Sequence, residues 1–90
     1  MTDEEVPTRD DVLHVVIRHL QANVEHLEGQ AIDPARAMSD LGASSLDIVE
    51  VVSCSMRELR VKIPRTELVG LANIDAFVDV LYGVAKAART

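Results

Sequence analysis

The chain has 90 residues, 48% of them apolar, which is enough for one small domain with a compact core and leaves no room for a second domain. Nine basic residues against fifteen acidic ones give a net charge of −6, which argues against nucleic acid or an anionic membrane as the partner. One Phe, one Tyr and no Trp leave an aliphatic core, so we expect an all-α domain.

Nothing in the sequence predicts export or membrane insertion. Cys54 is the only cysteine and cannot form an internal disulfide, and the acidic start of the chain is unlike a signal peptide. No apolar run is long enough to span a bilayer. We predict a cytoplasmic protein, with a flexible tail at residues 1–7 and one domain at residues 8–88. The polar residues near both ends favour a free-standing protein.

The first predicted helix opens at Thr8, which forms a capping-box pattern with Asp11, and closes at Gly29. Its apolar residues keep helical spacing at Leu13, Val16, Ile17, Leu20, Val24 and Leu27. The three histidines of the chain all fall here, but their spacing does not suit a metal site, so we expect surface or rim positions. They are His14, His19 and His26.

Residues 30–44 form a long connection that contains Pro34 and has little helical periodicity. A loop of this length either packs its own side chains against the core or carries function. The loop leads directly to Ser45. Ser44 and Asp47 form a second capping-box pattern there, and Gly42 is too small to crowd the helix end. We therefore expect the Ser45 hydroxyl to be exposed on the first turn of a helix.

This second predicted helix runs from Ser45 to Arg60 and stops before the extended segment 61–63 and Pro64. Its side chains form two stripes. One consists of Ile48, Val51, Val52, Ser55 and Leu59, and the other of Leu46, Val49, Ser53 and Met56. The first stripe can bury in the core; the second is either buried as well or an exposed contact surface. We interpret Cys54 as a small core residue because a reactive thiol would need cationic neighbours.

Two further elements complete the predicted fold. Thr66 can cap a short turn of helix that extends through Gly70, and Asn73 can cap the last helix. The last helix keeps its apolar period at Ile74, Phe77, Val78, Leu81 and Val84 or Ala85. The prediction is a small four-helix bundle of three longer helices and one short one, with a long loop between the first two.

The sequence lacks the residues for catalysis. Ser45 has no histidine in its own helix or the adjoining loops, and the chain has no Gly-x-Ser-x-Gly elbow, no Gly-rich phosphate loop and no Cys/His cluster. Asp40, Asp47 and Glu50 are ordinary partners of a helix dipole. We predict that the protein is not an enzyme, and that Ser45 is displayed to be modified by another protein.

The stretch from Leu41 to Glu50, LGASSLDIVE, resembles the Leu-Gly-x-Asp-Ser-Leu-x-x-Val-Glu signature of acyl carrier proteins of fatty acid and polyketide synthesis. The resemblance continues through Ile63-Pro64 to Asn73-Ile74. It implies that a magnesium-dependent phosphopantetheinyl transferase esterifies Ser45 with 4′-phosphopantetheine from coenzyme A. The thiol of this arm would then hold acyl groups as thioesters for loading, condensing and other biosynthetic enzymes. The expected protein is a monomer.

The resemblance also implies a surface for these partner enzymes around Ser45 and along the second helix. The candidate partner-binding residues are Ser44, Leu46, Asp47, Val49, Glu50, Ser53, Met56, Arg57 and Ile74. By this comparison the second stripe of the helix is exposed rather than buried, and Ile74 lies close to the arm.

Three departures from the family pattern point to a specialised polyketide or modified-lipid pathway. Ser44 replaces the usual Asp before the modified serine, and Ala37 stands where many relatives have a phenylalanine. The end of the second helix is basic where fatty-acid carriers are acidic. Four of the nine basic residues fall within nine positions, at Arg57, Arg60, Lys62 and Arg65.

Two alternatives remain open from the sequence. A peptidyl carrier of nonribosomal peptide synthesis shares the arm, but usually shows a Gly-Gly-x-Ser-Leu pattern and a neutral or basic surface. A helical interaction domain would use the stripe of Leu46, Val49 and Met56 to bind a partner, with Ser45 only part of a helix cap. Attachment of one phosphopantetheine arm at Ser45 would distinguish a carrier from such a domain.

Overall fold

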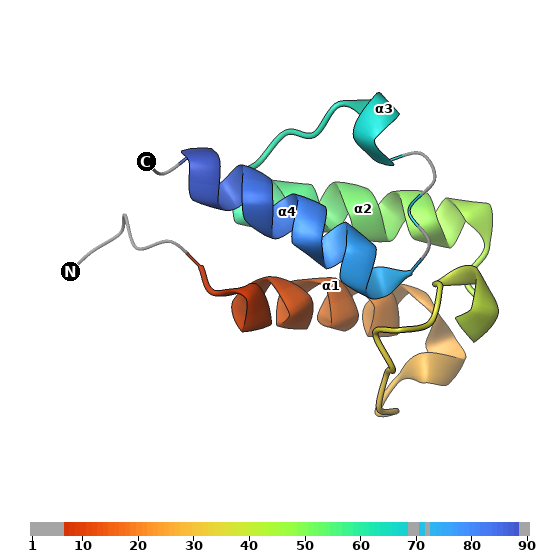
Figure 1. The fold of residues 1–90 in the computed structure, drawn as a ribbon. Helices are drawn as coiled ribbons and strands as arrows, with labels where there is room; N and C mark the ends of the chain where they lie inside the picture. The colour runs from red at the N-terminus through yellow and green to blue at the C-terminus, as the bar shows by residue number, and fades with distance from the viewer. Residues whose placement is uncertain (1–6, 69–70, 72, 89–90) are drawn as a thin grey trace.

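The computed structural model describes residues 7–68, 71 and 73–88, and every regular element among them is helical. The helices are α1 (Arg9–Asn23), α2 (Ser45–Leu59), α3 (Arg65–Leu68) and α4 (Ile74–Ala88). Two 3₁₀ turns, η1 (Glu25–Leu27) and η2 (Ser39–Leu41), lie in the long connection between α1 and α2. The helix α1 packs against both α2 and α4, and the short α3 lies beside α2 on the way to α4 (Figure 1). The predicted bundle is confirmed.

Side-chain caps fix where the three long helices begin, as the sequence predicts. The Thr8 hydroxyl accepts a hydrogen bond from the Asp11 N–H at 3.1 Å, and the Asp11 carboxylate accepts one from the Thr8 N–H at 3.0 Å. The Asn73 side-chain oxygen accepts a hydrogen bond from the Ala76 N–H at 2.8 Å. Each cap satisfies backbone donors that the helix itself leaves free, which stabilises the helix by about 1 kcal/mol.

The prediction that the first helix continues to Gly29 was wrong. α1 ends at Asn23, and Val24 is extended with φ −114° and ψ 103°. The Asn23 side-chain amide donates a hydrogen bond to the His19 carbonyl at 2.9 Å, which offers that carbonyl a local partner at the helix end. The chain then turns through η1, and this change of direction lets both Val24 and Leu27 bury in the core.

The second helix ends as predicted, within one residue. Arg60 takes the left-handed conformation with φ 59°, and the Val61 N–H donates to the Met56 carbonyl at 3.0 Å, which closes the helix in a Schellman motif. Val61 and Ile63 are buried and anchor the connection that follows. The predicted cap at Thr66 was wrong, because α3 already begins at Arg65.

Among the described residues the core consists of aliphatic side chains together with Met38, Phe77 and one buried serine, Ser55. α4 contributes the predicted residues, with Ala85 buried rather than Val84. The long connection packs its own side chains against the core, as one of the two alternatives predicted, through the buried Met38 and the partly buried Ile32 and Leu41.

Cys54 is only half-buried and lies outside the core cluster, so the prediction of a core residue was wrong. The residue after it, Ser55, points into the core, and one position corresponds to a rotation of about 100° around a helix.

The three histidines occupy surface or rim positions, as predicted. His14 and His26 are exposed and His19 is half-buried, and no group of three potential ligands that could hold a metal ion occurs among the described residues. No helix in the described part of the chain is both long and apolar enough to cross a membrane. The predicted tail, except for Pro7, and Gly70 lie outside the described residues.

Candidate functional site

Ser45 is the first residue of α2, and the loop before it is held in place from two sides. Gly42 has φ 92°, a left-handed conformation that glycine adopts without strain. Because glycine has no Cβ, it also leaves room for the neighbouring His26 ring. The His26 Nε2 lies 2.9 Å from the Leu41 carbonyl oxygen, and the Ala43 N–H donates to the Met38 carbonyl at 3.2 Å. Because η1 and the loop are joined here, the start of α2 has a fixed position on the bundle.

The two adjacent serines at the start of α2 have different surroundings. The Ser44 hydroxyl accepts a hydrogen bond from the Asp47 N–H at 3.1 Å, and the Asp47 carboxylate accepts one from the Ser44 N–H at 3.0 Å. Ser45 is exposed, and no hydrogen bond to its hydroxyl occurs within the described part of the chain. The cap therefore occupies Ser44 and leaves the Ser45 oxygen available to another molecule.

The start of a 15-residue helix also suits a phosphate group attached to Ser45. Backbone N–H groups without helical partners and the positive end of the helix dipole both favour an anion at this place. The exposed Gly42 has no side chain that could crowd this position. These residues fit a serine phosphodiester.

The stripe of α2 next to Ser45 is exposed at its beginning. Leu46 is 81% exposed and Val49 58% exposed, and both stand out as large apolar side chains at the surface of the described residues. Ser44, Glu50 and Arg57 are exposed, whereas Asp47, Ser53 and Met56 are half-buried. The structure thus brings eight of the nine predicted partner-binding residues to one accessible helix and its cap.

The ninth residue, Ile74, is fully buried, so the prediction that it belongs to the partner surface was wrong. The first turn of α4 binds the long connection through its backbone. The Ile74 N–H donates to the Arg36 carbonyl at 3.1 Å, and the Asp75 N–H donates to the Pro34 carbonyl at 2.9 Å. This docking directs the Ile74 side chain into the core.

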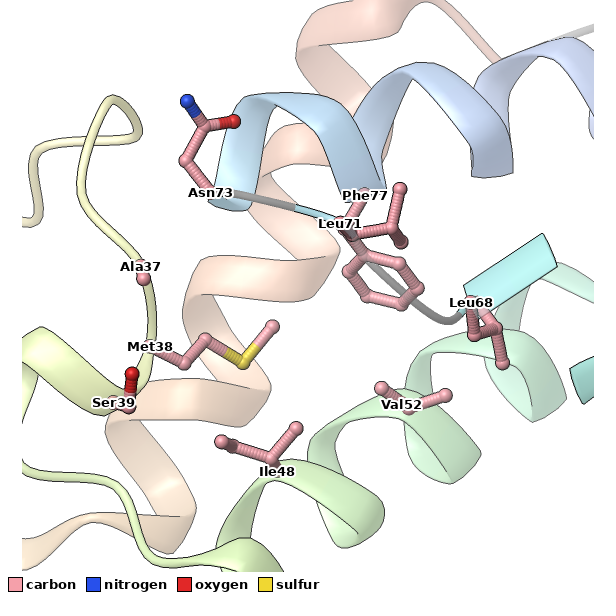
Figure 2. Close-up of a pocket in the computed structure, with 9 residues that line it drawn as sticks. All are labelled: Ala37, Met38, Ser39, Ile48, Val52, Leu68, Leu71, Asn73 and Phe77. Carbon is pink, nitrogen blue, oxygen red and sulfur yellow. The ribbon is translucent and has the colours of Figure 1, made fainter. Parts of the chain in front are cut away.

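A cavity of about 150 Å³ lies beside α2, between the long connection, α3 and the start of α4 (Figure 2). In Figure 2 the Met38 side chain and the Phe77 ring extend toward the space above Ile48 and Val52. The lining is mainly apolar and comprises Ala37, Met38, Ser39, Ile48, Val52, Leu68, Leu71, Asn73 and Phe77. A cavity of this volume holds a group of about six carbon atoms.

Sequence reasoning missed this cavity. Ile48 and Val52 were assigned to a core stripe, and both are only partly buried because they form one wall of the space. The available signal was Ala37, a small side chain on the loop where a larger one is usual, and it lies at the edge of the cavity. Its partners come from three other segments, which only the folded chain brings together.

Comparison with known proteins places this geometry in a family. The family model of the phosphopantetheine attachment site matches residues 15–81. The polyketide biosynthesis acyl-carrier-protein AcpK of Bacillus subtilis is 32% identical over 77 residues, which cover 86% of this chain and 94% of that protein. An acyl carrier protein of Campylobacter curvus is 33% identical over 75 residues, which cover 80% of this chain and 92% of that protein.

A solved structure shares both the fold and part of the sequence. It is the crystal structure of the curacin biosynthetic pathway HMG synthase in complex with acetyl donor-ACP. The match has a TM-score of 0.78 and 26% identity, and it covers 84% of this chain and 97% of the matched chain. Because the family model spans most of the sequence and the relatives align over nearly their whole length, this chain belongs to the acyl carrier protein family, whose cofactor is 4′-phosphopantetheine.

Proposed function

We propose that Ser45 carries the 4′-phosphopantetheine arm and that the protein holds short acyl groups on it, as thioesters, for the enzymes of a polyketide or related specialised pathway. The observation that carries this proposal is the contrast between the two serines at the start of α2. Ser44 uses its hydroxyl in the helix cap, while the exposed Ser45 hydroxyl has no intramolecular partner among the described residues.

The attachment reaction needs only a nucleophilic oxygen from this chain. The Ser45 oxygen forms a new bond to the phosphorus that carries the pantetheine group in coenzyme A, and the bond from that phosphorus to adenosine 3′,5′-bisphosphate breaks. The serine proton leaves to a base of the transferase. The start of α2 stabilises the resulting phosphodiester through its free N–H groups. Acyl transfer itself belongs to the partner enzymes, so this chain acts as their carrier and not as a catalyst. The proposed location of this role is the cytoplasm.

The cavity supports a short cargo. Its volume of about 150 Å³ holds about six carbon atoms, and its walls are apolar side chains of α2, α3 and α4. The relatives support the pathway class: one is a polyketide carrier, and another solved carrier is an acetyl donor to an HMG synthase. A carrier of short acyl units for condensation steps of this kind accounts for both observations.

Mass spectrometry tests the attachment site. The intact protein is incubated with coenzyme A, magnesium and a broad-specificity phosphopantetheinyl transferase. We expect the mass of one arm to be added to the unmodified chain and to Ser44→Ala, and no addition to Ser45→Ala. An arm that still attaches to Ser45→Ala, or no arm on the unmodified chain, would contradict the proposal.

A comparison of elongation rates on two carriers tests the specialised role. The holo-protein loaded with an acyl group is given to a housekeeping fatty-acid synthase system, with that system's own carrier as the control. We expect slower elongation on this chain than on the control, because the end of α2 is basic. Equal elongation on both carriers would contradict the assignment to a specialised pathway.

A further inference from the structure

The exposed face of α2 forms one continuous strip. Successive helical residues are rotated by about 100°, so residues three and four apart return to the same face. The strip runs from Leu46 through Val49, Glu50 and Ser53 to Arg57 and Arg60. With a rise of about 1.5 Å per residue it extends about 17 Å along the helix axis from Leu46 to Arg57, and the cap residue Arg60 follows. Its centre lies opposite the buried Val51, Ser55 and Leu59.

The charge of this strip changes sign along its length. Glu50 and Asp47 lie near its beginning, beside the exposed Leu46 and Val49. At the other end lie Arg57, Arg60 and, two residues beyond the helix cap, Lys62, here called the basic cluster. All three are exposed. A single partner surface that follows α2 therefore meets an apolar and acidic end and a basic end.

The basic cluster differs from two arginines that the fold holds in ion pairs. Arg9 forms ion pairs with Asp75 and Asp79, and Arg18 forms one with Glu58. No member of the basic cluster has an ion pair within the described ranges 7–68, 71 and 73–88. In a protein with a net charge of −6, three unpaired cations within six residues are available to carboxylates of another molecule.

The backbone at Arg60 supports the same conclusion independently. Its φ of 59° makes it the one non-glycine residue with positive φ in the described part of the chain. Glycine or asparagine takes this cap position with less strain, and the favourable effect of a cation on the helix dipole is already supplied by Arg57. Strained positions are often retained where the side chain has a function. The helix cap by itself therefore gives no reason for an arginine side chain at this position.

We propose that the basic cluster binds an acidic surface of the enzyme that exchanges acyl groups with this carrier. The apolar side chains of Leu46 and Val49 contact the rim of that enzyme's active-site entrance, where the arm on Ser45 enters. The enzyme carries carboxylates about 18 Å from the entrance, because Arg57 lies twelve helical residues from Ser45. This inference rests on the proposed function. Nucleic acid or an anionic membrane does not suit the strip, since half of it is apolar and acidic.

A pair of enzymes that differ only in surface charge tests the proposal. The probes are a β-ketoacyl condensing enzyme whose carrier-docking surface is basic, and the same enzyme with those lysines and arginines changed to glutamate. KM and kcat are measured with the acyl-loaded holo-protein. We expect a KM about fivefold lower for the glutamate enzyme, and this preference to disappear in 0.5 M salt, where the Debye length falls to about 4 Å.

Variants of the carrier locate the effect. We expect Arg57→Glu to reverse the preference between the two enzymes, and Arg36→Glu to leave it unchanged. Arg36 is an exposed arginine of the long connection outside the strip, so this control has the same change in charge. Arg60→Gly removes backbone strain, so we expect an equal or higher free energy of unfolding together with a raised KM for the glutamate enzyme. If Arg60 had only a structural role, Arg60→Gly would not raise KM while the free energy of unfolding stays equal or increases.

Three results would overturn the inference. The first is an equal KM for the two enzymes, and the second is an unchanged KM for the Arg60→Gly variant. The third is a dimer in sedimentation that Arg57→Glu dissociates, since a dimer would assign the strip to a second copy of the chain. Failure of the arm to attach to Ser45 would instead remove the proposed function itself. Mass spectrometry of the holo-protein before the kinetic experiment distinguishes the two cases.

Discussion

Gly42 determines how the chain enters α2. Its φ is 92°, and a Cβ at this position would lie 2.7 Å from Cε1 of His26. Gly29 provides a matched control, because its φ is 76° and nothing lies within 4 Å of its Cβ position. We expect Gly29→Ala to lower the free energy of unfolding by about 1 kcal/mol through backbone strain alone. Gly42→Ala should cost about 1 kcal/mol more, because the imidazole must move and its contact with the Leu41 carbonyl is lost. Chemical denaturation measures both.

The double variant His26→Ala/Gly42→Ala checks the cause. We expect it to cost less than the sum of the two single changes, because removal of the ring removes the steric part of the Gly42 effect. Equal stability of Gly42→Ala and Gly29→Ala would show that the ring exerts no constraint on the loop.

The hydroxyl oxygen of Ser55 affects the stability of the fold. Its side chain is fully buried in the core face of α2, and its hydroxyl has no hydrogen-bond partner among the residues that the structure describes. A buried polar group without a partner costs about 1–3 kcal/mol, so we expect Ser55→Ala to raise the free energy of unfolding by about 1 kcal/mol. Ser53→Ala, in the same helix but half-buried, should change it by less than about 0.5 kcal/mol. A loss of stability in Ser55→Ala would mean that its hydroxyl is bonded in solution.

At the scale of the elements, α1 and α2 are joined at the surface through Glu58. Its carboxylate accepts hydrogen bonds from Arg18 and from His19, the latter at 2.8 Å. The bond from Arg18 has the largest effect, and together the two bonds hold the pKa of Glu58 below its ordinary value of 4.5. Because the pKa is lower in the folded state, the stabilisation is fully present above the ordinary pKa. It is lost as the pH falls through the lower pKa of the folded protein.

Glu58→Gln tests this link. We expect a decrease of about 0.3–1 kcal/mol in the free energy of unfolding at pH 7, the size usual for exposed ion pairs. The decrease should vanish when the carboxyl of the unmodified protein is protonated. Glu28 is exposed and has no ion pair within the described residues, so Glu28→Gln is the control and should show no such dependence on pH. A pH-independent difference for Glu58→Gln would exclude the ion pairs as its cause.

The elements themselves were largely predictable from sequence. The three caps at Thr8, Ser44 and Asn73 are local, since each side chain bonds the backbone three residues away. The end of α1 was mispredicted, because Val24 and Leu27 keep helical spacing even though the chain turns between them. Periodicity reports which residues face the core, and a 3₁₀ turn can satisfy the same spacing.

At the scale of the whole molecule, the cavity limits the size of the cargo. Ala37 lines it from the long connection, and a phenylalanine there would occupy much of its volume of about 150 Å³. We expect Ala37→Phe to speed hydrolysis of a hexanoyl thioester on the arm by about threefold, because the chain loses its apolar shelter. An acetyl thioester should hydrolyse at an unchanged rate.

Ala35 offers the control for this experiment. It is exposed in the same loop and does not line the cavity, so Ala35→Phe should leave both rates unchanged. Equal rates for hexanoyl thioesters on Ala37→Phe and on the unmodified protein would show that the chain does not enter the cavity.

The sequence by itself determined the three long helices, their starting residues, and the serine in the signature, because caps and signatures are contacts within a few residues along the chain. Only the tertiary structure decided which side chains reach the surface. Ile74 is buried because α4 binds the long connection, and Leu46 and Val49 are exposed because α1 packs against the opposite side of α2. The cavity likewise joins four segments distant in sequence, so no local pattern encodes its volume.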